Sequence, residues 1–303
     1  MPKASPQELK YLLSNPATTL GEPRLYRLVS IEDRRYEAYD GRALSGRTPI
    51  LFVHGAQYSE PEDVLRDLVC PCLKTVSEVD KVDVERLDIL FLMWNSSFVC
   101  KRSNARLYSI LKAKGATRAA LATFDRWKSF FADVETRGHE AAEYLFPLVA
   151  PLFSNAPGRP LVITHSLGGL VWAETVTKMT SHAVLPKTLG HWWNLQPAIA
   201  HDAFHATGIY ASLPQLYVDH GTMIELWFSR LDCVLSSVYL AAKRRWAMGV
   251  TGVKHALVRN IDLTWSVLEA HGTVSWSRHH EGFWHRISPV VAERFRQFCL
   301  LER

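Results

Sequence analysis

A single serine stands at the junction of a predicted strand and a predicted helix. Residues 160–172 read Pro-Leu-Val-Ile-Thr-His-Ser-Leu-Gly-Gly-Leu-Val-Trp, so an apolar, β-branched run is followed by Ser166 and then by two glycines. A serine hydroxyl is a strong nucleophile only when a sharp turn holds it out of the chain, beside a base and the free N–H groups of a helix start. A serine that only caps the helix would give the same short match. The apolar run before Ser166 and the small residues after it favour the nucleophile.

The hexapeptide Thr-His-Ser-Leu-Gly-Gly at 164–169 resembles the nucleophile elbow of the α/β-hydrolase superfamily, especially of its lipases and esterases, which often read Gly-His-Ser-x-Gly-Gly. Thr164 takes the place of the first glycine, so either the strand and the helix separate slightly or the branched side chain finds a pocket. The resemblance covers residues 49–298. It implies an α/β fold with a doubly wound, mostly parallel sheet and helices on both faces.

A second stretch, Pro-Ile-Leu-Phe-Val-His-Gly-Ala-Gln at 49–57, is similar to the strand and oxyanion loop of the same superfamily. A tetrahedral oxyanion needs preorganised N–H donors, and the resemblance implies the amides of Ala56 and Leu167. Gly55 would let the backbone approach the substrate. His54 is expected to brace the loop rather than to act as a second base.

The acid that orients the base is expected after the predicted strand at 223–228, because the superfamily has the chain order serine, acid, histidine. Asp232 follows that strand and a polar break, and an apolar helix start comes after it. An aspartate that caps the helix would occupy the same position. We favour Asp232 as the acid, with Asp262 as the reserve.

The base is expected near the C-terminus, in the loop before the last predicted helix. His280 opens the run His-Glu-Gly-Phe-Trp, which best matches the residues that relatives often show at this place. His279 and His285 are the alternatives. The chain has 13 histidines, so position carries this assignment rather than residue type.

Alternating strands and helices are needed to bring these residues to one rim of a sheet, where parallel strands end. The apolar runs predict strands at 24–31, 50–53, 87–94, 161–164, 192–196 and 223–228, with edge strands in the turn-rich region up to Gly46. Helical patterns lie at 61–69 and 290–295.

These residues predict a serine hydrolase that cleaves a carboxylic ester, with an acyl or lipid ester favoured. Ser166, His280 and Asp232 would form the catalytic triad and an acyl-enzyme intermediate. Gln57, His165 and Trp284 are expected to contact the substrate, although a loop glutamine such as Gln57 is often only a surface residue. An amidase or peptidase with the same triad and a non-catalytic binding module of the same fold remain alternatives.

The sequence gives no support for a cofactor or a metal. It has no cysteine and histidine cluster with zinc spacing, no His-Glu-x-x-His, no Gly-x-Gly-x-x-Gly and no phosphate-binding loop.

The segment 98–130 concentrates positive charge. It holds eight lysines and arginines against Asp125 alone, a balance of +7 where the whole chain has a formal charge of +5. Aromatic and aliphatic residues interleave with these cations, as in amphipathic helices. The segment is interpreted as a solvated helix face, as a lid-like helical insertion over the site, or as a peripheral contact with an anionic membrane. Nucleic acid is not expected as a partner.

Length and composition fit a globular enzyme. With 303 residues, 48% of them hydrophobic and 21% charged, residues 1–303 are expected to form a single domain. No apolar stretch follows a positive start and no run of eighteen apolar residues occurs, so neither secretion nor membrane spanning is expected. The odd set of five cysteines favours a reducing cytoplasm. The sequence predicts neither the acyl and alcohol specificity nor the oligomeric state.

Overall fold

The computed structural model describes residues 22–39, 41, 47–56, 58, 60–74, 87–96, 116–271, 280, 290, 293–295, 297 and 298. For residues 116–127, 129, 130 and 269–271 the description covers the backbone alone. All statements below concern these parts of the chain.

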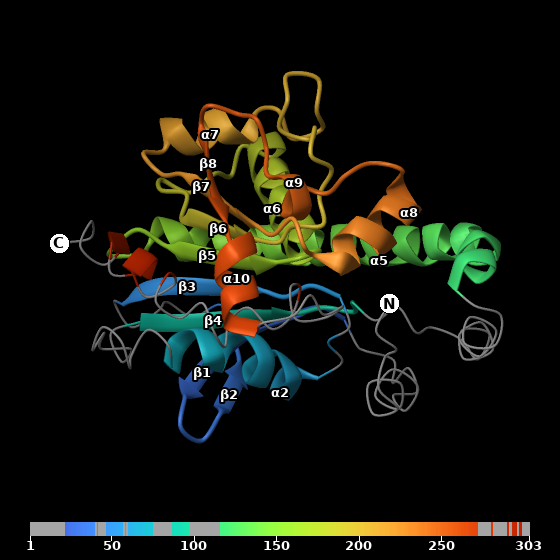
Figure 1. Ribbon diagram of the computed structural model, residues 1–303. Coiled ribbons are helices and arrows are strands. Elements are labelled where there is room, and N and C mark those ends of the chain that lie inside the picture. Colours follow the sequence, from blue (N-terminus) through green and yellow to red (C-terminus); the bar gives the residue numbers. More distant parts are fainter. Residues whose placement is uncertain are drawn as a thin grey trace.

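An eight-stranded sheet forms the centre of the molecule, with the strand order β2-β1-β4-β3-β5-β6-β7-β8 (Figure 1). From β4 to β8 along this order all neighbours run parallel, whereas β1 is antiparallel to both β4 and β2. The strands are β1 (Arg24–Ser30), β2 (Arg35–Ala38), β3 (Thr48–Val53), β4 (Leu87–Met93), β5 (Leu161–His165), β6 (His191–Leu195), β7 (Ile224–Phe228) and β8 (Val258–Asp262). The mostly parallel sheet predicted from the sequence is confirmed.

Burial explains which strands could be predicted from the sequence. Strands β5, β6 and β7 are buried at every position, and such strands are mostly apolar in sequence. Strand β8 lies at the edge and exposes Arg259 and Asn260, so it lacks that signal.

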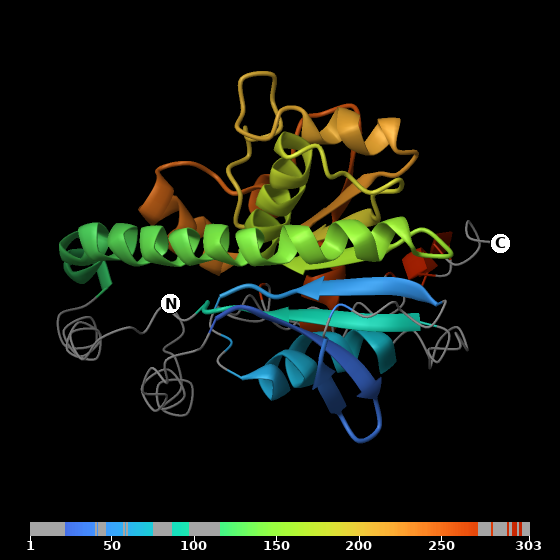
Figure 2. The same ribbon diagram turned by 180° about the vertical axis from the view of Figure 1, so that it is seen from behind.

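Helices cover both faces of the sheet, as predicted (Figures 1 and 2). One face packs against α5 (Ala116–Ser154), α6 (Gly168–Ser181), α7 (Leu213–Asp219), the π-helical segment η3 (Leu235–Tyr239) and α8 (Leu240–Lys243). The other face packs against α2 (Pro61–Val64), the π-helical segment η1 (Leu65–Val69), the residue that precedes α10 (Thr264–His271), α10 itself, and Phe295 and Phe298. A short helix α9 (Met248–Thr251) contacts β7.

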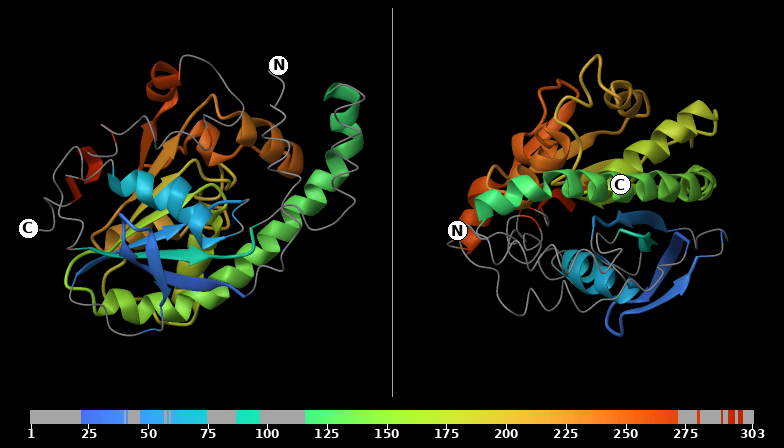
Figure 3. Two further views of the ribbon diagram at one scale, coloured as in Figure 1. Left: turned by 90° about the horizontal axis from the view of Figure 1, so that it is seen from below. Right: turned by 90° about the vertical axis from the view of Figure 1, so that its right-hand side faces the viewer.

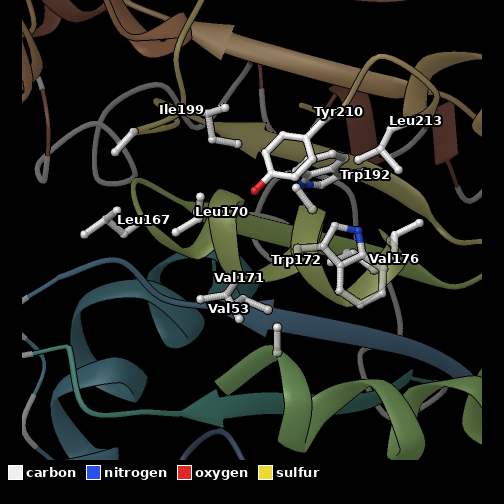
Figure 4. Close-up of a cluster of buried hydrophobic side chains, with 14 of the residues drawn as sticks. Val53, Leu167, Leu170, Val171, Trp172, Val176, Trp192, Ile199, Tyr210 and Leu213 are labelled. Carbon is white, nitrogen blue, oxygen red and sulfur yellow. The ribbon is translucent and has the colours of Figure 1, made fainter. Parts of the chain in front are cut away.

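The larger of the two cores lies under α6. Figure 4 shows side chains from β3, α6, β6 and the segment 199–213 meeting in one cluster. Trp172 of α6 and Trp192 of β6 are both fully buried there, and Trp172 Nε1 donates to the hydroxyl of Tyr217 at 2.7 Å. This core fixes α6 against the sheet, and α6 begins next to Ser166.

Helix α5 is 39 residues long and includes Pro147 and Pro151. Its N-terminal end extends past the sheet (Figures 2 and 3). Of the segment 98–130, residues 116–130 form the start of this helix, and residues 98–115 lie outside the described residues. The lid therefore stays a prediction. In the described part of the chain, no helix has the length and hydropathy that crossing a bilayer requires.

Candidate active site

Ser166 occupies a strained turn between β5 and α6. Its φ is 54°, in the left-handed region that non-glycine residues rarely adopt. The Ser166 amide donates to the carbonyl of Leu195 at the end of β6 (2.9 Å), and its own carbonyl accepts from the amide of Ala198 (3.0 Å). The neighbouring strand and its loop thus hold the turn on both sides. This is the geometry of a nucleophile elbow.

Two glycines permit the close packing around the elbow. A Cβ atom on Gly168 would lie 2.1 Å from the carbonyl oxygen of Val53, so α6 can touch the end of β3 only with glycine there. A Cβ atom on Gly55 would lie 2.7 Å from the Cβ of Ser166. The loop after β3 therefore contacts the serine directly.

The side chain of Thr164 finds a pocket, which is the second of the two arrangements expected for it. Trp192 Nε1 donates to Thr164 Oγ1 (2.8 Å), and that hydroxyl donates to Asn194 Oδ1 (2.9 Å). All three side chains are fully buried. Hydrogen bonding satisfies the hydroxyl within the core, which is the condition for burying a polar group at low cost.

The structure brings Ser166, His280 and Asp232 together. His280 Nε2 lies 3.1 Å from Ser166 Oγ, and His280 Nδ1 lies 2.7 Å from Asp232 Oδ2. The three residues are 5%, 6% and 0% exposed. A carboxylate only accepts, so Nδ1 carries the proton of a neutral ring and Nε2 is left to accept from the serine hydroxyl. The alternative bases His279 and His285 lie outside the described residues.

Asp232 caps a helix start and orients the histidine at the same time. Its Oδ1 accepts from the amide of Leu235 (2.9 Å), while Oδ2 faces His280. The two roles that the sequence left as alternatives are therefore compatible, because each would use a different oxygen of the carboxylate. Asp262, the reserve, accepts from the amide of Thr264 (2.9 Å) at the start of α10 and pairs with Arg230 (3.3 Å).

His54 braces the loop after β3, in line with the expectation for it. Its Nδ1 lies 2.7 Å from the carbonyl of Gly55, and its Nε2 accepts from the amide of Trp94 (3.4 Å). Burial lowers the pKa of His54 to about 4, so the ring is neutral and donates through Nδ1. The carbonyl of Gly55 and the N–H of Ala56 belong to one trans peptide group and point in opposite directions. Because His54 Nδ1 binds that carbonyl, the amide of Ala56 points away from the ring of His54. Leu167, the other expected oxyanion donor, directly precedes α6, whose N-terminus favours negative charge.

Of the residues expected to contact substrate, Gln57 and Trp284 lie outside the described residues. His165 is described, is 4% exposed, and lies with Nε2 2.7 Å from the carbonyl oxygen of His280. Nothing in the sequence signals this contact, because the two residues are 115 positions apart. Among the described residues, no group of three or more His, Cys, Asp or Glu side chains is arranged to hold a metal ion.

A cavity of about 230 Å³ borders α6 at Leu170, and its lining does not include Ser166, Asp232 or His280. Ala198, whose amide bonds the carbonyl of Ser166, is part of its wall. Lys243 and Glu135, which form an ion pair, also line it. The rest of the lining is mostly apolar and consists of Leu170, Ile199, Ala200, Ile209, Tyr239 and Arg245.

The strand order and the site together define the α/β-hydrolase fold. The serine follows β5 on a strand-to-helix turn, the aspartate follows β7, and the histidine follows β8. The order of the strands reverses between β3 and β5, and the crevice at such a reversal is where open α/β sheets bind ligands. Ser166 and the His54 loop meet at this reversal.

Solved structures of esterases and lipases are similar to this chain. The EstE5–PMSF structure has 14% identity, covers 97% of this chain and 92% of its own, and has a TM-score of 0.39. For naproxen esterase (carboxylesterase NP) from Bacillus subtilis the identity is 11%, the coverage 98% and 99%, and the TM-score 0.37. Carboxyl esterase 2 from the mycorrhizal fungus Tuber melanosporum has 9% identity, coverage of 85% and 80%, and a TM-score of 0.38. No family model and no curated protein sequence matches the chain.

Proposed function

We infer that this protein is a serine hydrolase that cleaves carboxylic esters. The observation that supports this most directly is the pair of contacts that link Ser166 Oγ to His280 Nε2 and His280 Nδ1 to Asp232 Oδ2. Nucleophile, base and acid stand in the order that proton transfer requires.

In the first half of the reaction, Ser166 Oγ attacks the carbonyl carbon of the ester while His280 Nε2 takes its proton. The carbonyl oxygen becomes an oxyanion, which accepts hydrogen bonds from the amides of Ala56 and Leu167. His280 then gives the proton to the leaving alkoxide, and an acyl-serine remains. In the second half, His280 removes a proton from water, which attacks the acyl carbon, and Ser166 regains its proton as the acid leaves.

Asp232 holds the imidazole in the tautomer that this sequence needs and stabilises the imidazolium that forms in each half. The cavity near the elbow is mostly apolar, and both of its cations are paired, Lys243 with Glu135 and Arg245 with Asp202. It therefore suits an acyl chain better than a charged group. The substrate class that follows is an ester of an apolar acid.

A fluorophosphonate probe tests the proposal, because it labels only serines that are activated as nucleophiles. Mass spectrometry should find the label on Ser166, and Ser166→Ala should take up none. Ser181→Ala is the control. It removes the serine at the last residue of α6, the helix that follows the elbow, and should be labelled like the wild type. Label on another serine, or label that persists in Ser166→Ala, would overturn the assignment.

Esters of graded acyl length, measured beside matching amides, define the substrate. We expect turnover of esters to require Ser166 and to exceed that of the amides. Faster turnover of the amides would favour the amidase or peptidase alternative.

A further inference from the structure

Two neighbouring residues of the chain contact His280 at two different points. Ser166 Oγ faces the ring nitrogen Nε2 at 3.1 Å, and His165 Nε2 faces the main-chain oxygen at 2.7 Å. The two imidazole rings lie close, with centroids 4.9 Å apart. The strand end that carries the nucleophile therefore also holds the backbone of the base.

His165 is neutral and its proton position follows from its partner. Burial lowers the pKa of His165 to about 3, and repulsion from His280 and His54 whenever those rings are protonated acts in the same direction. A neutral imidazole carries one N–H, and a carbonyl oxygen can only accept. The proton of His165 therefore sits on Nε2, and the contact is a hydrogen bond from His165 to His280.

We propose that His165 is a positioning residue that fixes the main chain of His280 so that its ring spans Ser166 and Asp232. The inference rests on the proposed function. His280 is 114 positions away from Ser166 in the chain, so its placement depends on tertiary contacts. Displacing a catalytic group by about 1 Å can cost on the order of a hundredfold in rate. The bond from His165 acts on the backbone of His280 and does not compete with the contacts of its ring to Ser166 and Asp232.

Three variants separate this role from general support of the core. His165→Leu keeps a buried side chain and loses the donor, whereas His165→Gln can place an amide N–H near the position of Nε2. His191→Leu is the matched control, because His191 is a buried histidine whose ring accepts from the amide of Met223 and which begins β6, at the end of the sheet away from the site.

For His165→Leu we expect kcat to fall by roughly 10- to 100-fold while KM changes little, because substrate binding is intact and the base is misplaced. His165→Gln should recover most of the turnover. When the variants are compared at equal thermal stability, His191→Leu should keep the wild-type kcat. Wild-type turnover in His165→Leu, or equal losses in the Leu and Gln variants, would overturn the proposal.

A second measurement does not depend on activity. The ¹⁵N–¹H spectrum of the histidine rings in the wild type should show His165 as the Nε2–H tautomer, unchanged between about pH 5 and 8. An Nδ1–H tautomer, or titration in that range, would contradict the hydrogen bond. If the wild type hydrolyses no ester and takes up no fluorophosphonate, the proposed function fails, and the spectrum still tests the contact.

Discussion

At the scale of single residues, the carboxylate of Asp232 links chemistry to stability. One oxygen caps the helical segment that begins after it, and the other faces His280. Substitutions can separate the two roles, because asparagine is as good an N-cap as aspartate but cannot stabilise an imidazolium with a charge.

We therefore expect Asp232→Asn to lower turnover by about a thousandfold or more, through loss of the correct tautomer, with little change in melting temperature. Asp232→Ala should lose the same turnover and in addition about 1 kcal/mol of stability, since the amide of Leu235 loses its acceptor. Steady-state kinetics and thermal unfolding of both variants check this. A mild kinetic effect of Asp232→Asn would instead give weight to Asp262.

The sequence was sufficient to find Ser166, Asp232 and His280 as candidates, because each lies at a set place relative to a predicted strand or to the last helix. It was not sufficient for the partners of Thr164 and His165. Those partners lie 30 and 115 positions away, and no local pattern encodes them. Thr164 stands at a position that is often glycine, and the structure explains why it fits there: its hydroxyl bonds the buried side chains of Trp192 and Asn194.

At the scale of elements, the approach of α6 to β3 decides where the elbow points. The approach depends on the missing side chain of Gly168, next to the carbonyl of Val53. Gly138 of α5 offers a comparison, because a Cβ atom there would meet its nearest neighbours, Leu170 and Val171, at 3.5 Å, an ordinary contact distance.

Gly168→Ala should destabilise the protein by about 1–3 kcal/mol or more, as overpacking of a rigid core does, and should impair labelling of Ser166. Gly138→Ala should be neutral or stabilising by up to about 1 kcal/mol, since alanine is the better helix former. Chemical denaturation of the two variants measures the difference. Equal stabilities would show that the contact between α6 and β3 is not tight.

Strands buried on both faces could be predicted because most of their residues are apolar. Strand β8 is not among the strands predicted above, since half-exposed edge strands keep polar residues. The extent of α5 could not be predicted for another reason. Proline in a helix interior removes a hydrogen bond and usually marks an end, yet α5 continues through Pro147 and Pro151.

At the scale of the whole molecule, folding buries several histidines as neutral rings. Burial lowers the pKa to about 4 for His54, about 3 for His165 and about 4 for His191. In the unfolded chain these rings take up protons near about pH 6.5. Below that pH the unfolded state binds more protons than the folded state.

The free energy of unfolding should therefore be largest above about pH 6.5 and fall as the pH is lowered towards 4, by up to about 1.4 kcal/mol per pH unit for each histidine. His139, whose pKa is raised by its hydrogen bond to Glu174, adds stability that is fully present below about pH 6.5 and is lost as the pH rises through its folded-state pKa, so its effect lies above the window of the three buried histidines. Denaturation curves at several pH values should show a shallower slope for His191→Gln than for the wild type. Identical slopes would mean that His191 is not buried as a neutral ring.

The long separation between Ser166 and His280 has a consequence for the newly made chain. Synthesis proceeds from the N-terminus, so Ser166 leaves the ribosome 114 residues before His280, the base proposed for it. Until His280 emerges and docks beside Asp232, Ser166 lacks the base that we propose for it, so we expect the nascent chain to be without the proposed activity.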